Sequence, residues 1–463
     1  MDRVFKLIEA SERLESEGSG VSDIRADKEC LVYFLASKEG VIAIKALPDE
    51  IKLRVGDAVE TLAKFGVLSR EDAQAILALL KHEDLVFRAR MWYAADTLLE
   101  GNILKVKEMS KVTKAYVEIF EEGDTVAKFF ALRVAPYLVE KGVIEPEVLR
   151  EDEDVYKAVE EVIMAISKSE MRKVIVATVL DLIHKKALEP RALDRVKPLV
   201  LSDLKLTEQD VKLLTIMVAE GVINASDKQY LVRYLEHPDL DKRAVYWLVS
   251  PLLLDRKVLT KDELRGMLEY LNELLVTKIA TWGPARALFN MGVVGASELK
   301  NHARYLFKLI GSSDDCLALR ILIDLLNDGI LSAKDFEEYK STILSPERLK
   351  VPCTMPLEKI DVLVEKGVIT DRDRELILNL LESPRSSLVV AINAALIWSR
   401  SPVLVERKII TPEDIKQRVP TLMELAKEVR YTPIWPEFVE ALQKLAAMGV
   451  IDFGLDDLMT LAS

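Results

Sequence analysis

Apolar residues along this chain recur mostly at the three- and four-residue spacing that places them on one face of an α-helix. The segment 311–328 is an example, because Leu319, Leu322, Leu325 and Leu326 fall on one side of such a helix. Runs that alternate between apolar and polar residues, which predict half-buried strands, are almost absent. The pattern therefore predicts an all-α protein.

The helical segments are separated by a short phrase that recurs along the chain. Residues 366–384, KGVITDRDRELILNLLESP, contain its fullest form. The second residue of the phrase falls at positions 66, 101, 142, 186, 221, 257, 292, 329, 367, 408 and 449. Successive positions are 35 to 44 residues apart, so the chain repeats a unit of about 40 residues.

The phrase predicts the end of one helix and the start of the next. Gly367 follows an apolar helix, where the chain adopts a left-handed conformation that glycine reaches at low cost. Val368 and Ile369 cross the turn, Thr370 caps the next helix, and Asp373 stands where a capping-box acid is expected. The same pairing is expected at Ser69/Asp72, Thr207/Asp210, Thr260/Glu263, Ser332/Asp335 and Thr411/Asp414.

Each unit thus contains a helix A, a glycine turn, a helix B and a polar link to the next unit. Paired antiparallel helices of this length resemble the HEAT and armadillo class of repeat proteins. HEAT units carry an Asp before helix A and an Arg in it, as do Asp84 with Arg88 and Asp239 with Arg243, whereas the other units mostly lack this pairing. The resemblance implies a right-handed α-solenoid of about 11–12 antiparallel helical pairs.

Breaks in the repeat suggest the domain organisation. We expect an N-terminal capping helix with a flexible link over residues 1–20, followed by HEAT-like repeats over residues 21–342. Three prolines between 343 and 359 predict a long loop, where the array can bend. C-terminal HEAT-like repeats are expected over residues 360–463.

Composition narrows the choice of partner. The 463 residues carry a net charge of -12, which disfavours a chain that binds duplex nucleic acid over its whole surface. Charged residues make up 30% of the chain and glutamine is scarce, a composition that favours a thermophilic source. The apolar half of the chain is poor in aromatic residues, yet Trp92, Trp247, Trp282 and Trp398 are expected in the core.

Cysteine usage and hydropathy suggest the compartment. Cys30, Cys316 and Cys353 form no CxxC pair, which argues against a zinc ribbon and against a disulfide framework. We expect a reducing cytoplasm, since the N-terminus lacks the features of a signal peptide. No apolar run reaches the roughly 18 residues of a spanning helix, so no membrane partner is expected.

The sequence offers no catalytic constellation. His82, His184, His237 and His302 are single residues in different units, so neither a metal site nor another cofactor is expected. Phosphate-binding loops and nucleophile motifs are also missing from the sequence. We therefore expect a protein that is not an enzyme, while an enzyme of unrecognised type stays open as an alternative.

Basic residues give a candidate interaction surface. Three lysines are spaced for one stripe on a helix B, and three more cations follow about two units later. Trp435, between prolines, is the aromatic residue most expected at the surface. The candidate residues are Lys107, Lys111, Lys114, Lys185, Arg191, Arg195 and Trp435.

Two functions are compatible with these residues. The first is a non-enzymatic scaffold or adaptor that binds a protein partner on the concave face of the solenoid. The alternative is association with nucleic acid or ribonucleoprotein through the lysine/arginine stripe at 105–197. A solvated helix face without a ligand is the structural alternative for the same residues.

Overall fold

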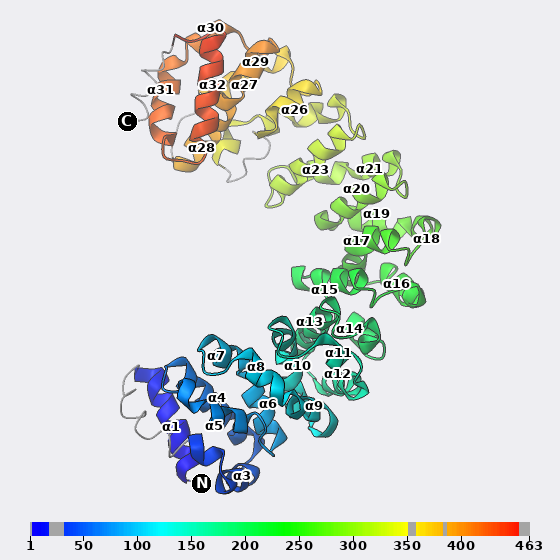
Figure 1. Ribbon diagram of the computed structural model, residues 1–463. Coiled ribbons are helices and arrows are strands. Elements are labelled where there is room, and N and C mark those ends of the chain that lie inside the picture. Colours follow the sequence, from blue (N-terminus) through cyan, green and yellow to red (C-terminus); the bar gives the residue numbers. More distant parts are fainter. Residues whose placement is uncertain (1, 18–31, 351–357, 383–386, 453–463) are drawn as a thin grey trace. The chain divides into compact units, whose positions relative to one another are not determined.

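The computed structural model describes residues 2–17, 32–350, 358–382 and 387–452 (Figure 1). All regular elements in this part of the chain are helices, most of them α and several short ones 3₁₀. The prediction of an all-α protein is therefore confirmed. The chain divides into two compact units, residues 1–234 with 252–258 and residues 235–251 with 259–463.

The first unit begins with α1 (Asp2–Glu17), which packs on α4 through buried Val4, Leu7 and Leu14. Its further elements are α3 (Lys38–Lys45), α4 (Asp49–Lys64), η2 (Arg70–Asp72), α5 (Ala73–Leu79), α6 (Leu85–Tyr93), α7 (Ala95–Glu100), α8 (Val106–Met109), η3 (Ser110–Val112), α9 (Thr113–Glu122), α10 (Thr125–Glu140), α11 (Pro146–Arg150), α12 (Glu153–Ala165), α13 (Ser169–His184), η4 (Pro190–Leu193), α14 (Lys197–Ser202), α15 (Glu208–Ala219), η5 (Ala225–Asp227) and α16 (Lys228–Leu235).

Helix α17 (Leu240–Asp255) contributes residues to both units. The second unit further contains α18 (Lys261–Gly266), α19 (Leu268–Leu275), η6 (Ile279–Thr281), α20 (Trp282–Asn290), α21 (Ala296–His302), α22 (Arg304–Lys308), α23 (Asp315–Asn327), η7 (Ala333–Tyr339), α24 (Lys340–Ile343), η8 (Pro346–Lys350), α26 (Ile360–Glu365), η9 (Asp371–Asp373), α27 (Arg374–Leu381), α28 (Leu388–Ser399), α29 (Ser401–Glu406), α30 (Pro412–Lys416), α31 (Val419–Val429) and α32 (Trp435–Ala447).

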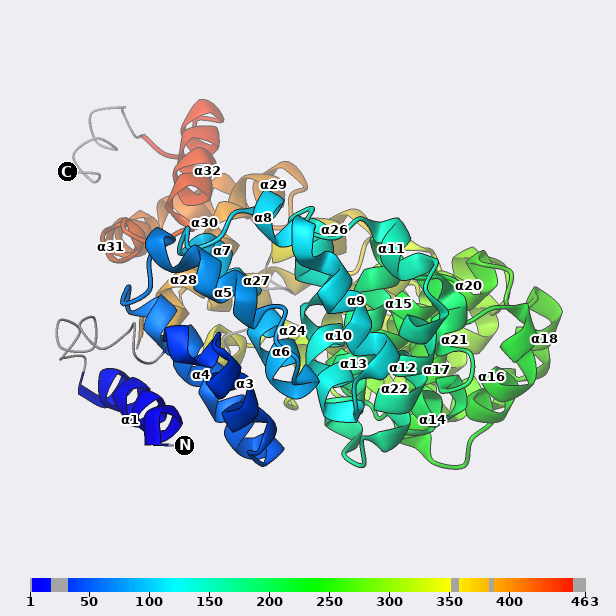
Figure 2. The same ribbon diagram turned by 60° about the horizontal axis from the view of Figure 1, so that its bottom comes forward.

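Within the first unit, helices of the same kind lie next to one another. The A helices α4, α6, α10 and α13 pack in chain order, and the B helices α9 and α12 also contact each other (Figures 1 and 2). Helices A and B of one pair also contact each other, as α6 does α9 and α10 does α12. In the second unit α28 packs against both α31 and α32.

Three tryptophans on A helices form hydrogen bonds with the C-terminal end of the preceding helix. Trp92, Trp247 and Trp282 are fully buried, and their indole N–H groups donate to the carbonyl oxygens of Leu80, Leu235 and Leu275 at 2.9, 3.0 and 2.9 Å. Each bond satisfies a carbonyl at the end of a helix that would otherwise lack a partner. Trp398 is also buried, so the predicted core role of the four tryptophans is confirmed.

The turns between helices A and B have the expected geometry with one correction. Gly66, Gly142, Gly221, Gly292, Gly329, Gly367 and Gly449 have positive φ, as do Lys186, Lys257 and Lys408. At the second turn the left-handed residue is Asn102, with φ 56°, and not Gly101. Asn tolerates this region better than most residues with a side chain, so Gly101 can end the helix.

At the start of helix B, the carboxylate three residues after the capping residue accepts a hydrogen bond from the backbone N–H of that capping residue. Asp373 accepts from the Thr370 N–H at 2.8 Å, and Asp414 does the same for Thr411 at 2.8 Å. The predicted pairing also holds at Ser69/Asp72, Thr260/Glu263 and Ser332/Asp335. At Thr207 only the hydroxyl acts as expected, because the Asp210 carboxylate accepts from the Lys205 N–H instead.

The same acids bind a cation from helix B of the preceding pair. Arg374 donates to Asp414 from Nε at 2.9 Å, and Lys340 lies 3.2 Å from Asp373. Equivalent pairs are Arg70–Glu108, Lys197–Asp227 and Lys300–Asp335. One carboxylate thus fixes the start of its own helix and links it to the neighbouring pair.

A second cation connects the two helices of one pair. Nε of Arg88, on α6, donates to the carbonyl oxygen of His82, and its Nη1 lies 2.9 Å from the Glu118 carboxylate on α9. Arg243 repeats these contacts with His237 and Glu273. The two Asp–Arg pairs that carry the HEAT resemblance therefore have the same local structure.

Two further findings differ from the sequence expectations. Cys316 forms a disulfide bond, whereas three isolated thiols were expected; Cys30 and Cys353 lie outside the described residues.

The helical segment at residues 388–406, which covers α28 and α29, is long and apolar enough to cross a membrane. Two thirds of that window are buried among the packed helices, as in a core helix. Of the expected loop at 343–359, η8 is described and residues 351–357 are not.

We predict that Gly367→Ala lowers the free energy of unfolding by about 1–2 kcal/mol, because a Cβ is disfavoured at its φ of 73°. No atom lies within 4 Å of the added Cβ, so the effect comes from the backbone alone. Urea unfolding measures it. Gly266→Ala is the control, since Gly266 is helical with equal space, and it should be neutral or stabilising. Equal losses of unfolding free energy in both variants would contradict the role of the left-handed backbone at Gly367.

We predict that Asp414→Asn lowers the free energy of unfolding by about 2 kcal/mol, since it removes a buried charge-assisted acceptor. Burial tends to raise the pKa of the Asp414 carboxyl, but hydrogen bonds from Arg374 and Thr411 outweigh it and hold that pKa at about 2. Because this pKa is lowered on folding, the stabilisation is present above the ordinary value of 3.8 and is lost as the pH falls toward 2.

Urea unfolding of the wild type and Asp414→Asn, at neutral pH and in steps below the ordinary carboxyl pKa, tests this pH dependence. The two proteins should converge in stability at the lowest pH. Glu413→Gln, an exposed neighbour in the same turn, is the control and should change stability by less than about 0.5 kcal/mol. A difference that does not vary with pH would show that the charge is not responsible.

Candidate functional site

The three lysines of the predicted stripe lie on three successive short elements rather than on one helix. Lys107 belongs to α8, Lys111 to η3 and Lys114 to α9. All three side chains are exposed, and no carboxylate among the described residues lies within ion-pair distance of them. These lysines are available to an anionic ligand.

The other three cations are already paired. Lys185 lies 2.6 Å from Asp181 and 3.6 Å from Glu140. Arg191 contacts Glu153 at 2.7 Å and Glu189 at 2.9 Å, and its guanidinium also stands over the ring of Tyr156. Arg195 lies 3.1 Å from Glu160. An anion would have to compete with these carboxylates, so the stripe at 105–197 is not a continuous free basic surface.

Trp435 is less exposed than expected. It is the first residue of α32, half-buried, and its ring centroid lies 6.2 Å from that of Phe438. Tyr431, in the preceding link, is 80% exposed and lies beneath the Arg430 guanidinium. The exposed aromatic of this segment is therefore Tyr431.

A groove lies between the A helices α10 and α13 of the first unit. It has a volume of about 500 Å³. Its lining residues are Arg133, Pro136, Tyr137 and Glu140 from α10 and Val174, Ala177, Thr178 and Asp181 from α13. The sequence analysis named none of these residues as functional, and it placed the candidate surface elsewhere.

The helices that form the groove and the neighbouring helix α6 also carry partly exposed apolar and aromatic side chains. Val174 is 39% exposed and Met171, one turn earlier on α13, is 45% exposed. On α10 the half-buried Phe130 packs edge-on against Phe129 and against Tyr93 of α6, with centroids 5.5 and 5.3 Å apart. Exposed aromatic residues, methionine and arginine are typical of protein interfaces. We call Tyr93, Phe129, Phe130, Arg133, Met171 and Val174 the A-face patch.

The sequence did contain a signal for this patch. Apolar residues occupy more than one side of α10, because Ala131, Ala135 and Leu138 are buried while Phe129 and Phe130 remain partly exposed. An amphipathic helix at a simple surface shows one apolar stripe. Because α10 packs against α6, α9, α12 and α13, most of these apolar positions are buried inside the protein, and only the packing shows which of them stay partly exposed.

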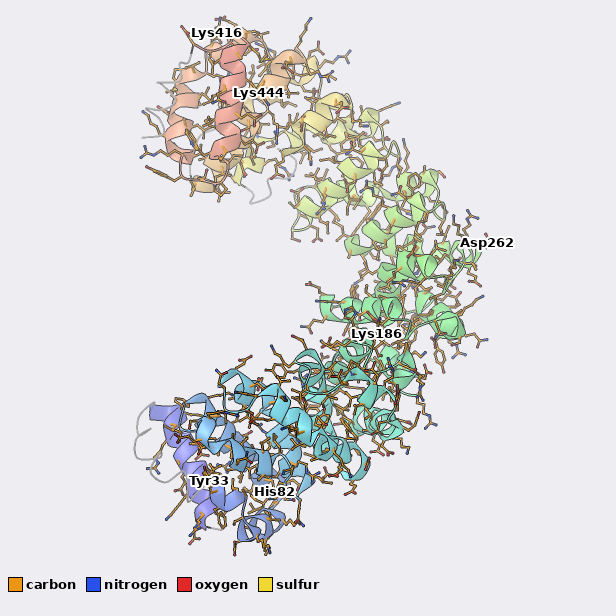
Figure 3. All side chains as sticks on the ribbon, viewed as in Figure 1. Tyr33, His82, Lys186, Asp262, Lys416 and Lys444 are labelled. Atoms are coloured by element: carbon orange, nitrogen blue, oxygen red, sulfur yellow. The ribbon has the colours of Figure 1, made fainter. Side chains whose placement is uncertain are left out.

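His82 is the buried histidine of the first unit (Figure 3). Its Nδ1 accepts from the Asp84 N–H at 3.0 Å, and its ring packs edge-on against Phe87 at 4.9 Å. Burial lowers the pKa of the imidazole to about 4. These contacts give His82 a structural role before helix α6. No three His, Cys, Asp or Glu side chains among the described residues are grouped as metal ligands.

No known family model matches the sequence, and no curated protein matches it significantly. Function must therefore be argued from the surface of the chain itself.

Proposed function

We propose that this protein is a non-enzymatic scaffold or adaptor, a HEAT-like α-solenoid that binds a protein partner. The recurring turn, the ion pairs between successive B helices and the contacts between successive A helices support a stacked array of pairs. A radius of gyration well above about 23 Å, the value for a compact chain of this length, would support stacking. A value near 23 Å would contradict it.

The observation that favours a protein partner is the A-face patch. It combines three aromatic rings, an arginine, a methionine and a valine on neighbouring A helices, beside a groove of about 500 Å³. Such side chains supply most of the binding energy at interfaces when they enter a desolvated contact. The concave face expected from the sequence is in this proposal the face formed by the A helices.

We predict that Val174→Asp abolishes capture of the partner, because the new carboxylate replaces an exposed apolar contact beside Arg133. Immobilised wild type and variant are incubated with extract of the source organism, and bound proteins are compared by quantitative mass spectrometry. A protein enriched by the wild type and lost with the variant supports the proposal.

Ile42→Asp provides the matched control for this capture. Ile42 is 70% exposed on α3, which lies apart from α10 and α13 in Figures 1 and 2. The Ile42→Asp variant should capture the same protein as the wild type. Equal loss in both variants, or no protein that depends on the A-face patch, would exclude this surface as the partner site.

A second candidate function is nucleic-acid association through Lys107, Lys111 and Lys114. It is favoured by the absence of carboxylates within ion-pair distance of these three side chains in the described structure. If this function is correct, the wild type binds heparin at low salt. Replacing the three lysines by serine should then reduce the slope of log K against log salt concentration by roughly 0.9 for each lost phosphate contact. No retention of the wild type on heparin would exclude it.

A further inference from the structure

Arg133 is the exception among the cations of the first unit. The other buried or half-buried cations described there each have a carboxylate within 4 Å, whereas Arg133 has none. The paired cations are Lys52, Arg88, Arg90, Lys128, Arg150, Arg172, Lys173, Lys185 and Lys197. The Arg133 side chain is half-buried, so its positive charge can be paired by a carboxylate that comes from outside the chain.

The acids that line the groove do not supply this charge. Asp181 and Glu140 are both directed to the Lys185 ammonium group, at 2.6 and 3.6 Å. Within the described part of the chain, the Arg133 guanidinium donates a single hydrogen bond, to the Thr178 hydroxyl, at a long distance of 3.4 Å. Most of its five N–H donors are therefore available at the groove.

We propose that the groove between α10 and α13 binds an acidic side chain of a protein partner, and that Arg133 is the residue that recognises its carboxylate. This inference rests on the proposed partner binding at the A-face patch and specifies its chemistry. A planar guanidinium donates N–H groups to both oxygens of a carboxylate in a bidentate pair. Pro136 and Val174 then contact an apolar residue next to the acid in the partner segment.

Tyr137 supports this assignment. It lies one helical turn after Arg133 on the groove side of α10, and its hydroxyl is buried without a hydrogen-bond partner. Such a hydroxyl is expected to find an acceptor in the functional state. A carboxylate of the partner bound in the groove would provide such an acceptor.

The test uses displayed random peptides selected on the immobilised full-length chain. We expect enriched peptides to share an Asp or Glu beside an apolar residue. Synthetic copies are then measured by fluorescence anisotropy, with the acid kept or replaced by its amide. Loss of the charge should weaken binding to the wild type roughly tenfold or more.

The variants assign the effect to the groove. With Arg133→Ala the acid and amide peptides should bind equally, whereas Arg133→Lys should keep part of the preference because it keeps the charge. Arg195→Ala, which removes an exposed arginine outside the groove, should behave as the wild type. Circular dichroism confirms that each variant is folded. No enriched acid, no effect of the amide, or an unchanged preference in Arg133→Ala overturns the inference.

The peptide-binding test and the capture test can fail independently of each other. Capture of a protein through the A-face patch without any preference for acidic peptides rejects the role of Arg133 alone. Acidic peptides that bind through Arg133, when no protein depends on the patch, reject the proposed scaffold function and leave the binding chemistry in place.

Discussion

The arrangement of the helices depends on a carboxylate that serves two helical pairs at once. Asp414 accepts the Thr411 amide at the start of α30 and the Arg374 guanidinium from α27. An isolated buried carboxylate is unfavourable, but one that accepts backbone amides and a cation is well satisfied. This contact recurs at Glu108, Asp227, Asp335 and Asp373, so at these turns the preceding pair supplies a cation to the carboxylate that caps the next helix B. The turn is therefore both a helix start and a link between repeats.

The A helices are held differently. Tryptophans bond the carbonyls of preceding helix ends, and Arg88 and Arg243 bind both an upstream carbonyl and a carboxylate on helix B. These contacts use the inner side of the A helices and the start of each helix. Between α10 and α13, Lys185 contacts both Glu140 and Asp181, whereas Arg133 has no carboxylate within ion-pair distance among the described residues. This difference makes the groove beside Arg133 the candidate ligand site.

Local features were predictable because their partners lie a few residues away. Thr370 with Asp373 was readable as a capping pair, and the spacing of apolar residues identified the helices and the core tryptophans. Errors arose where one residue decides a conformation, as at Asn102, or where a partner is distant. Arg191 and Arg195 were candidates for a basic interaction surface, but each contacts a carboxylate, Glu153 or Glu160, that lies 38 or 35 residues earlier. Spacing along one helix does not show what the neighbouring repeat places opposite it.

The sequence by itself determined the helical class, the repeat and the turns between helices A and B, since these turns depend on local hydrogen bonds and on a left-handed residue. Only the tertiary structure decided which charged side chains form ion pairs within the protein. Arg133 and Lys185 look alike in the sequence, yet Lys185 faces two carboxylates and Arg133 faces none. Whether a charged residue stabilises the fold or remains available to a partner depends on atoms brought within a few ångströms by packing, and that information is not local to the chain.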